Sequence, residues 1–198
     1  MFAARSLAIR RGRRLVLRGV DFALEPVGLL LITGANGSGK SSLLRALAGL
    51  LPPAGGEILW QGEIVQDFAA HRARLHYLGH LDALKPELSV TEMLNYWSAL
   101  RGDPPPAADL AQRFGLAADA PVRFLSAGQR RRLALARLAL NDAPLWLLDE
   151  PATALDAKGR ELLATLLAAH RKKGGVAVIA AHQAADFEGA QLALGEAA

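Results

Sequence analysis

The eight residues 34–41, Gly-Ala-Asn-Gly-Ser-Gly-Lys-Ser, restrict the possible folds of this chain more than any other segment. An apolar run typical of a buried strand, 29–33, precedes them, and a helical pattern with Leu43, Leu44 and Leu47 on one face follows. Closely spaced glycines let the backbone curl so that successive N–H groups point inward, and the helix adds the positive end of its dipole. The segment therefore predicts a strand, a phosphate-binding loop and a helix.

Each residue of this loop has an expected part in binding a nucleoside triphosphate. Lys40 is expected to reach the β- and γ-phosphates, and the hydroxyl of Ser41 to ligate Mg²⁺. The other expected nucleotide-binding residues are Gly34, Ala35, Asn36, Gly37, Ser38, Gly39 and Ser42. The alternative is a glycine-rich turn that matches by chance, at odds on the order of one in a hundred for average glycine usage. The flanking strand and helix patterns lower those odds further.

Two acids end a second apolar strand pattern, at 145–148. Asp149 is expected to hold Mg²⁺ beside the phosphate loop, because such a strand carries the metal-binding Asp in phosphate-loop NTPases. Glu150 is expected to orient and deprotonate the attacking water. A strand that merely ends in solvated acids is the alternative, and the loop upstream favours the functional interpretation.

The segment 125–129, Leu-Ser-Ala-Gly-Gln, predicts a capping box in which Ser126 and Gln129 close a helix N-terminus. A cap alone is one interpretation, and an anion site made by the helix N-terminus and the serine hydroxyl is the other. The position between the phosphate loop and the acidic strand favours the second, which assigns Ser126, Gly128 and Gln129 to nucleotide binding. Asp156, after the acids, is expected to cap the next helix, to serve a functional loop, or both.

The order of these motifs over about residues 6–183 resembles that of the ATP-binding-cassette (ABC) ATPases. The resemblance implies a P-loop NTPase that hydrolyses ATP with Mg²⁺ as a homodimer. It implies that Ser126 faces the γ-phosphate of a second subunit's ATP and that Asp156 lies in a loop crossing the dimer interface. It also implies that His182, after the strand pattern 176–181, contacts the γ-phosphate. Ala127 is a mild departure, since glycine is commoner there.

Two more positions depart from the ABC pattern. His80 stands where a glutamine usually links the catalytic core to the membrane subunit. Arg10 and Arg11 stand where an aromatic residue commonly stacks on adenine. Because the plane of a guanidinium can also stack on a ring, Arg11 is the expected contact to the base.

Several short segments are similar to those of the cytochrome c biogenesis (haem exporter) ATP-binding proteins: 59–62, 77–80 with Lys85, 125–138 and 182–183. The resemblance implies a cytoplasmic subunit, peripheral on the cytoplasmic face of the bacterial inner membrane. It would bind an integral membrane transporter subunit and use ATP for haem export or release of a haem chaperone. The residues themselves show no haem ligation, because there is no cysteine and no histidine pair at ligand spacing.

Two other functions stay open. One is an ABC ATPase for another substrate, distinguished only by His80 and the resemblance at 77–85. The other is a non-transport ABC ATPase acting on nucleic acid or ribosomes, which a single uninterrupted cassette argues against. A net charge of +4 with arginine clusters such as 130–132 fits nucleic acid, anionic headgroups or a solvated face. We expect no direct nucleic-acid contact, and membrane contact only through the partner.

The pattern of elements predicts an α/β fold, since alternating strands and helices indicate a mostly parallel sheet. With the resemblance, it predicts one ABC ATPase domain, 2–198, with an antiparallel β part at the N-terminus and an inserted helical lobe at about 86–140. No run approaches the ~20 apolar residues of a membrane span.

Strands are expected at 7–9, 15–24, 29–33, 57–60, 75–78, 145–148 and 176–181. Helices are expected after the phosphate loop, at 89–100, up to 114, from 126 and at 158–172.

Overall fold

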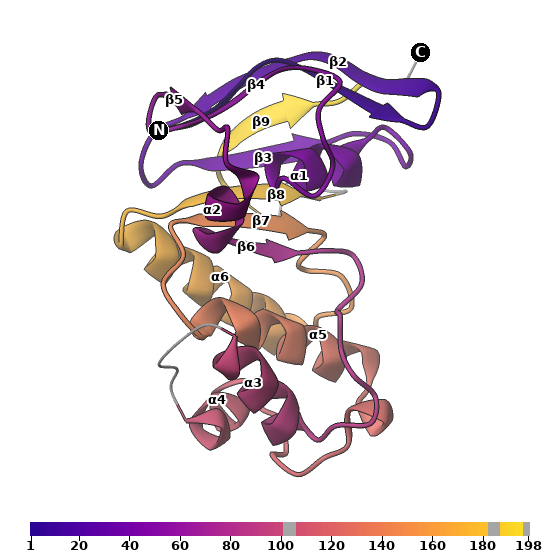
Figure 1. The fold of residues 1–198 in the computed structure, drawn as a ribbon. Helices are drawn as coiled ribbons and strands as arrows, with labels where there is room; N and C mark the ends of the chain where they lie inside the picture. The colour runs from indigo at the N-terminus through magenta and orange to yellow at the C-terminus, as the bar shows by residue number, and fades with distance from the viewer. Residues whose placement is uncertain (101–105, 182–186, 196–198) are drawn as a thin grey trace. The chain divides into compact units, whose positions relative to one another are not determined.

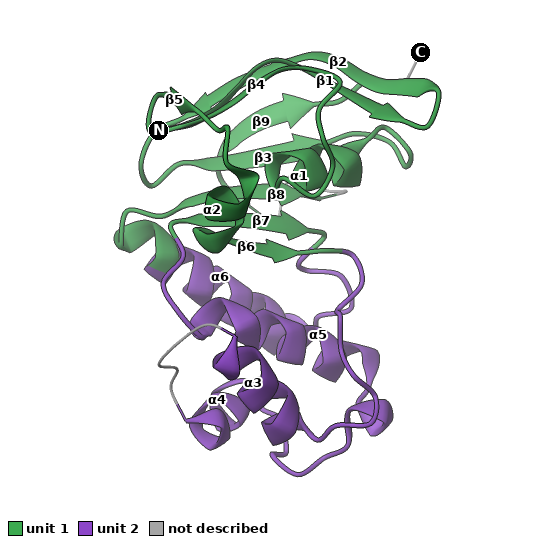
Figure 2. Ribbon diagram, in the orientation of Figure 1, with its two compact units in different colours: residues 1–79, 144–150, 170–198 green, residues 80–143, 151–169 purple. Residues whose placement is uncertain are grey.

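The computed structural model describes residues 1–100, 106–181 and 187–195, which form two compact units (Figures 1 and 2). Unit 1 comprises Met1–Gly79, Pro144–Glu150 and His170–Ala198, and unit 2 comprises His80–Ala143 and Pro151–Ala169. The stretch predicted to be helical, 86–140, lies wholly in unit 2.

An antiparallel sheet in the order β2-β1-β4-β5 forms one part of unit 1 (Figure 1). Its strands are β1 (Phe2–Arg11), β2 (Arg14–Leu24), β4 (Gly55–Trp60) and β5 (Glu63–Ile64). The strand expected at 7–9 is longer than predicted, because β1 pairs with β2 along one side and with β4 along the other. Ala4, for example, lies opposite both Phe22 and Ile58. The predicted antiparallel part is confirmed.

A parallel sheet in the order β6-β7-β8-β3-β9 forms the other part of unit 1. Its strands are β3 (Leu29–Thr33), β6 (Leu75–Leu78), β7 (Leu145–Asp149), β8 (Val176–Ala180) and β9 (Ala190–Ala193). The three central strands are almost wholly buried, as continuous apolar runs in a parallel sheet should be. The sequence did not predict β9, which is short and largely exposed.

The helix after the phosphate loop, α1 (Lys40–Leu47), packs against β7 and β8 of the parallel sheet and against β1 of the antiparallel one. Its buried residues Leu43, Leu44 and Leu47 join the apolar side chains of both sheets in one core. A short helix that the sequence did not predict, α2 (Phe68–Ala73), contacts β6 and is capped by Asp67. Together these contacts hold the start of α1 in a fixed place in unit 1.

Unit 2 is helical. Its elements are α3 (Val90–Ala99), α4 (Ala107–Arg113), η1 (Val122–Phe124), α5 (Ala127–Ala136), η2 (Arg137–Ala139) and most of α6 (Ala157–Lys172). The part of α6 that belongs to unit 2 ends at Ala169. A capping box opens α3, since Ser89 and Glu92 exchange two hydrogen bonds. In the described part of the chain, no helix is both long and apolar enough to cross a membrane.

Candidate functional site

The phosphate loop between β3 and α1 has the backbone that its glycines predict. Gly34 and Gly39 have φ angles of 147° and 102°, which residues with a side chain rarely adopt. A Cβ on Gly34 would come within 2.7 Å of both the carbonyl oxygen of Leu194 and the hydroxyl of Ser38. The loop therefore requires glycine here for conformation and for space.

Lys40, the first residue of α1, is buried within this loop. Its side chain is 6% exposed, and its ammonium donates hydrogen bonds to the carbonyl oxygens of Gly34, at 2.7 Å, and Ala35, at 3.0 Å. A lysine ammonium has three N–H donors, so one is left for a phosphate oxygen. The lysine thus both shapes the loop and brings a positive charge to it.

Three serines line the same segment with different exposures. The hydroxyl of Ser38 is buried and has no hydrogen-bond partner within the part of the chain that the structure describes. Such an orphaned polar group fits a loop that receives an additional hydrogen-bonding ligand. Ser41 is exposed in the first turn of α1, whereas Ser42 is buried. The donor set of the loop therefore suits an anionic, oxygen-rich ligand.

The two acids stand where β7 ends. Asp149 is the last residue of β7 and is 2% exposed. The next backbone N–H, that of Glu150, donates to the carbonyl oxygen of Ala180 at 2.8 Å. Glu150 has a left-handed φ of 49°, a strained conformation of the kind that clusters at active sites.

Parallel strands bring the acids and the loop to one edge of the sheet. Strands β3, β8 and β7 are parallel and consecutive, so their carboxyl ends lie at the same edge. Strand β8 lies between β3, which leads into the loop at Gly34, and β7, which ends at Asp149. The axes of β3 and β7 are therefore two strand spacings apart, about 10 Å. That span leaves room for phosphates and a metal ion.

Tyr77, half-buried on β6, provides a neutral neighbour for this edge. It lies opposite Leu147 of β7. Burial raises the pKa of the Tyr77 phenol, and the negative charge of Asp149 raises it further, while a hydrogen bond with Arg45 opposes both effects. The phenol therefore stays protonated at neutral pH beside the buried carboxylate.

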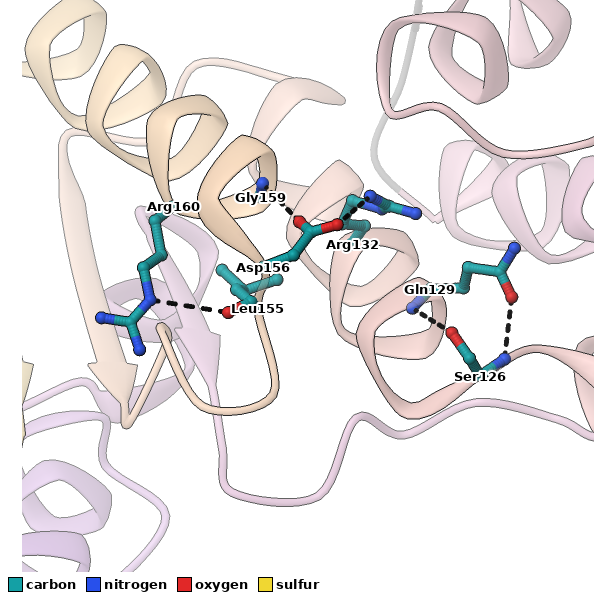
Figure 3. A network of polar contacts seen from close by, with 7 residues as sticks. All are labelled: Ser126, Gln129, Arg132, Leu155, Asp156, Gly159 and Arg160. Atoms are coloured by element: carbon teal, nitrogen blue, oxygen red, sulfur yellow. Dashed lines mark hydrogen bonds and ion pairs between the residues drawn. The ribbon is translucent and has the colours of Figure 1, made fainter.

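The predicted capping box at the start of α5 is present in unit 2 (Figure 3). The backbone N–H of Ser126 donates to the side-chain oxygen of Gln129 at 2.8 Å, and the N–H of Gln129 donates to the Ser126 hydroxyl oxygen at 3.2 Å. The serine keeps its own O–H as a donor. A Cβ on Gly128 would lie 2.9 Å from the carbonyl oxygen of Ala154, so the loop after the acids runs directly against α5.

Asp156 caps α6, as the sequence suggested. One carboxylate oxygen accepts a hydrogen bond from the N–H of Gly159 at 2.8 Å, and the other lies 3.4 Å from Arg132 of α5 (Figure 3). Arg160 donates to the neighbouring carbonyl of Leu155 at 3.5 Å. The loop at 154–156 is therefore tied to both α5 and α6 within unit 2.

The remaining predicted residues lie at exposed places or outside the described chain. Arg11 is exposed at the end of β1, opposite Arg14 of β2. His80 is exposed at the start of unit 2. His182 lies outside the described residues. Within the described ranges, no group of three or more His, Cys, Asp or Glu side chains could by itself hold a metal ion.

One buried residue contradicts its sequence-based interpretation. A solvated face was one interpretation of the arginine run 130–132. Arg131 is instead 4% exposed, and it donates hydrogen bonds to the carboxylate of Asp82 and to the carbonyl oxygen of Pro151. No signal in the sequence distinguishes it from its two arginine neighbours.

Comparison with known proteins gives one consistent result. Residues 17–153 match the family model of ABC transporters. The chain is 52% identical over 199 residues to the cytochrome c biogenesis ATP-binding export protein CcmA of Paramagnetospirillum magneticum, covering 96% of this chain and 91% of that protein. It is 50% identical over 196 residues to the protein of the same name from Rhodospirillum rubrum, covering 97% and 84%.

Solved structures share the fold at lower sequence identity. A putative ABC transporter ATP-binding protein from Pyrococcus furiosus superposes with a TM-score of 0.85 at 22% identity, covering 98% of this chain and 96% of that one. The ATP-binding cassette MJ0796, solved as a dimer in a post-hydrolysis state bound to ADP and Pi, superposes with a TM-score of 0.81 at 23% identity, covering 94% and 90%. At these identities the likeness establishes the fold.

Proposed function

Since the chain belongs to the ABC transporter family, among its cytochrome c biogenesis ATP-binding export proteins, we propose that it powers haem export for cytochrome c maturation. It is an ABC ATPase and binds ATP. The observation that carries the proposal is 52% identity over 96% of the chain. Identity over that length is not confined to the short motifs that every ATP-binding cassette shares.

The triphosphate is proposed to lie on the loop 34–39 and the N-terminus of α1. Backbone N–H groups of the loop, the remaining N–H of Lys40 and the buried hydroxyl of Ser38 would bind its oxygens. The guanidinium plane of Arg11 would stack on the adenine. The exposed position of Arg11 at the end of β1 supports this assignment, because it leaves the guanidinium accessible to a ligand.

Mg²⁺ is proposed to be held by the hydroxyl of Ser41 and the carboxylate of Asp149. Two protein oxygens suit this ion, which usually keeps several waters and substrate phosphates as its other ligands. When bound, it would neutralise charge on the β- and γ-phosphate oxygens. The position of Asp149 supports the role, because it ends β7 at the same edge of the parallel sheet as the start of the phosphate loop.

Glu150 is proposed to act as the general base for hydrolysis. Its carboxylate would accept a proton from water as that water attacks the γ-phosphate in line with the leaving group. Lys40 would stabilise the negative charge that spreads over the γ-phosphate oxygens, and His182 would contact the same phosphate. The strained backbone of Glu150 supports a functional rather than a structural role.

Two copies of the chain are proposed to close around two ATP molecules, head to tail. Ser126, Gly128 and Gln129 would bind the γ-phosphate held by the loop of the second copy, and Asp156 would lie at the interface. The O–H of Ser126 and the N-terminus of α5 are donors suited to that anion. We further propose that 2–198 form a single ABC ATPase domain with the stretch 86–140 as its helical lobe.

The chain is proposed to work at the cytoplasmic face of the bacterial inner membrane, bound to an integral membrane transporter subunit. His80 would take the place of the usual glutamine in sensing that subunit, because an imidazole can also relay a shift by hydrogen bonding. Its exposure on unit 2 leaves it accessible to such a partner.

Deletion of the gene tests this proposal. Loss of covalent haem attachment to c-type cytochromes, with other haem proteins still loaded, is the expected result. Wild-type protein should restore attachment, and Lys40→Ala should not. Normal assembly of c-type cytochromes in the deletion strain would contradict the haem assignment and leave an ABC ATPase for another substrate.

A further inference from the structure

Arg131 is a buried cation near the middle of α5. Its Nε donates to the carbonyl oxygen of Pro151 at 3.2 Å, and one terminal nitrogen donates to the carboxylate of Asp82 at 2.8 Å. The side chain of Arg131 is 5% exposed and that of Asp82 is 24% exposed. A guanidinium at this depth is strongly disfavoured without partners, so these contacts help to hold Arg131 in place.

These two contacts connect three segments that the proposed function uses. Asp82 lies two residues after His80, and Pro151 directly follows Glu150. Arg131 itself belongs to the helix that begins at the Ser126 cap. One planar side chain in unit 2 therefore holds the segment after His80, the residue after the general base and the start of α5 in a single arrangement.

The backbone is strained at one residue beside each of the two hydrogen-bond acceptors of Arg131, Asp82 and Pro151. Ala83, which follows Asp82, has a φ of 53°, and Glu150, which precedes Pro151, has a φ of 49°. The left-handed region is unfavourable for residues with a Cβ, and it persists only where surrounding contacts hold it. Arg131 supplies such a contact to each segment, so losing it would let both segments relax.

We propose that Arg131 is a positioning residue that transmits a displacement of the segment 80–83 to α5 and to the residue after Glu150. The proposal rests on the proposed function, in which His80 meets the membrane subunit. A guanidinium presents its donors in a rigid fork, so Asp82 cannot move without moving Arg131 or breaking the ion pair. Movement of α5 carries Ser126 with it, and thereby reaches the γ-phosphate bound by the second copy.

The test compares ATP turnover in the complex with the membrane subunit against turnover of the isolated chain. The double variant Asp82→Asn, Arg131→Met removes both charges of this ion pair together, so neither member of the pair stays charged after losing the other. The ratio of the two rates should fall at least about fivefold, the lower end of usual coupling between sites, while the Kd for ATP is unchanged. Arg131→Lys, which keeps the charge but not the fork, should lower the ratio as well.

Arg130→Met is the matched control. Arg130 is the neighbouring arginine of α5, and its guanidinium donates a hydrogen bond to the carbonyl oxygen of Leu125, directly before the Ser126 cap. The control should keep the wild-type ratio. A wild-type ratio in a folded double variant, or in Arg131→Lys, would overturn the coupling role alone. If the wild-type chain neither binds the membrane subunit nor responds to it, the proposed function fails first, and the coupling role fails with it.

Discussion

The carbonyl oxygen of Ala154 lies so close to Gly128 that a Cβ on the glycine would approach it to 2.9 Å. Gly128→Ala should push the 154–156 loop away from α5, since the clash is with backbone rather than with a flexible side chain. We expect kcat/KM for ATP to fall at least about tenfold, the effect of roughly 1.4 kcal/mol of lost transition-state stabilisation. Steady-state kinetics would measure it. Gly55→Ala, whose Cβ would meet only Ala8 at 3.8 Å, should remain near wild type.

Lys40→Ala should abolish ATP hydrolysis and also loosen the phosphate loop. The ammonium of Lys40 bonds to the carbonyls of Gly34 and Ala35, so its removal frees both and takes away the charge expected on the γ-phosphate. Turnover and nucleotide affinity should both fall in parallel assays. Lys158→Ala, at an exposed lysine of α6, should alter neither quantity, and equal activity of the two variants would remove Lys40 from the site.

Glu150→Gln should lower turnover by about 10²–10⁴-fold, the usual contribution of a general base, and leave ATP binding intact. Glutamine keeps the shape of the side chain and loses only its ability to accept the proton. Single-turnover kinetics and equilibrium binding of ATP would separate the two effects. Glu63→Gln, an exposed acid on β5, is the control. Turnover near wild type for Glu150→Gln would assign the base to another group.

Acid should destabilise the fold through His71. Burial lowers the pKa of this imidazole below its ordinary 6.5, against a hydrogen bond with the carbonyl of Leu47 that raises it. Above pH 6.5 the ring is neutral in both states, so the stabilisation is fully present. As the pH falls below 6.5, the unfolded chain takes up a proton that the folded chain resists, and stability is lost.

Urea unfolding at several pH values measures this effect. The free energy of unfolding should fall with a slope of up to about 1.4 kcal/mol per pH unit from this residue, until the folded state also protonates. His71→Gln should show a smaller slope than wild type, because the titrating group is absent. Identical slopes for the two proteins would show that His71 titrates alike in both states.

The motifs could be read from the sequence because each is local. The glycines and Lys40 of the phosphate loop, the Ser126 cap and the acids after 145–148 each need only neighbouring residues to specify their structure. The predicted strands and helices flanking them are confirmed for the same reason, with apolar runs or caps at their boundaries.

What the sequence could not supply depends on contacts between distant residues. Strand β9 has no apolar pattern and exists because its backbone pairs with β3, from Leu30 opposite Ala190 onward. Helix α2 has six residues, too few to show a periodic pattern, and is held by its Asp67 cap. The burial of Arg131 depends on Asp82, 49 positions away, so a run of arginines gave no sign of it.

The most direct test of the composite site combines two inactive variants in one dimer. Dimers that carry Lys40→Ala in one copy and Ser126→Arg in the other, isolated by two different affinity tags, should keep one intact site. They should hydrolyse ATP at about half the wild-type rate, because a symmetric head-to-tail dimer has two equivalent sites. A second kind of dimer pairs one copy that carries both substitutions with one wild-type copy. It should be inactive, since each of its two sites then has one defect. Activity of the second kind of dimer without activity of the first would contradict the account and place each site within a single chain.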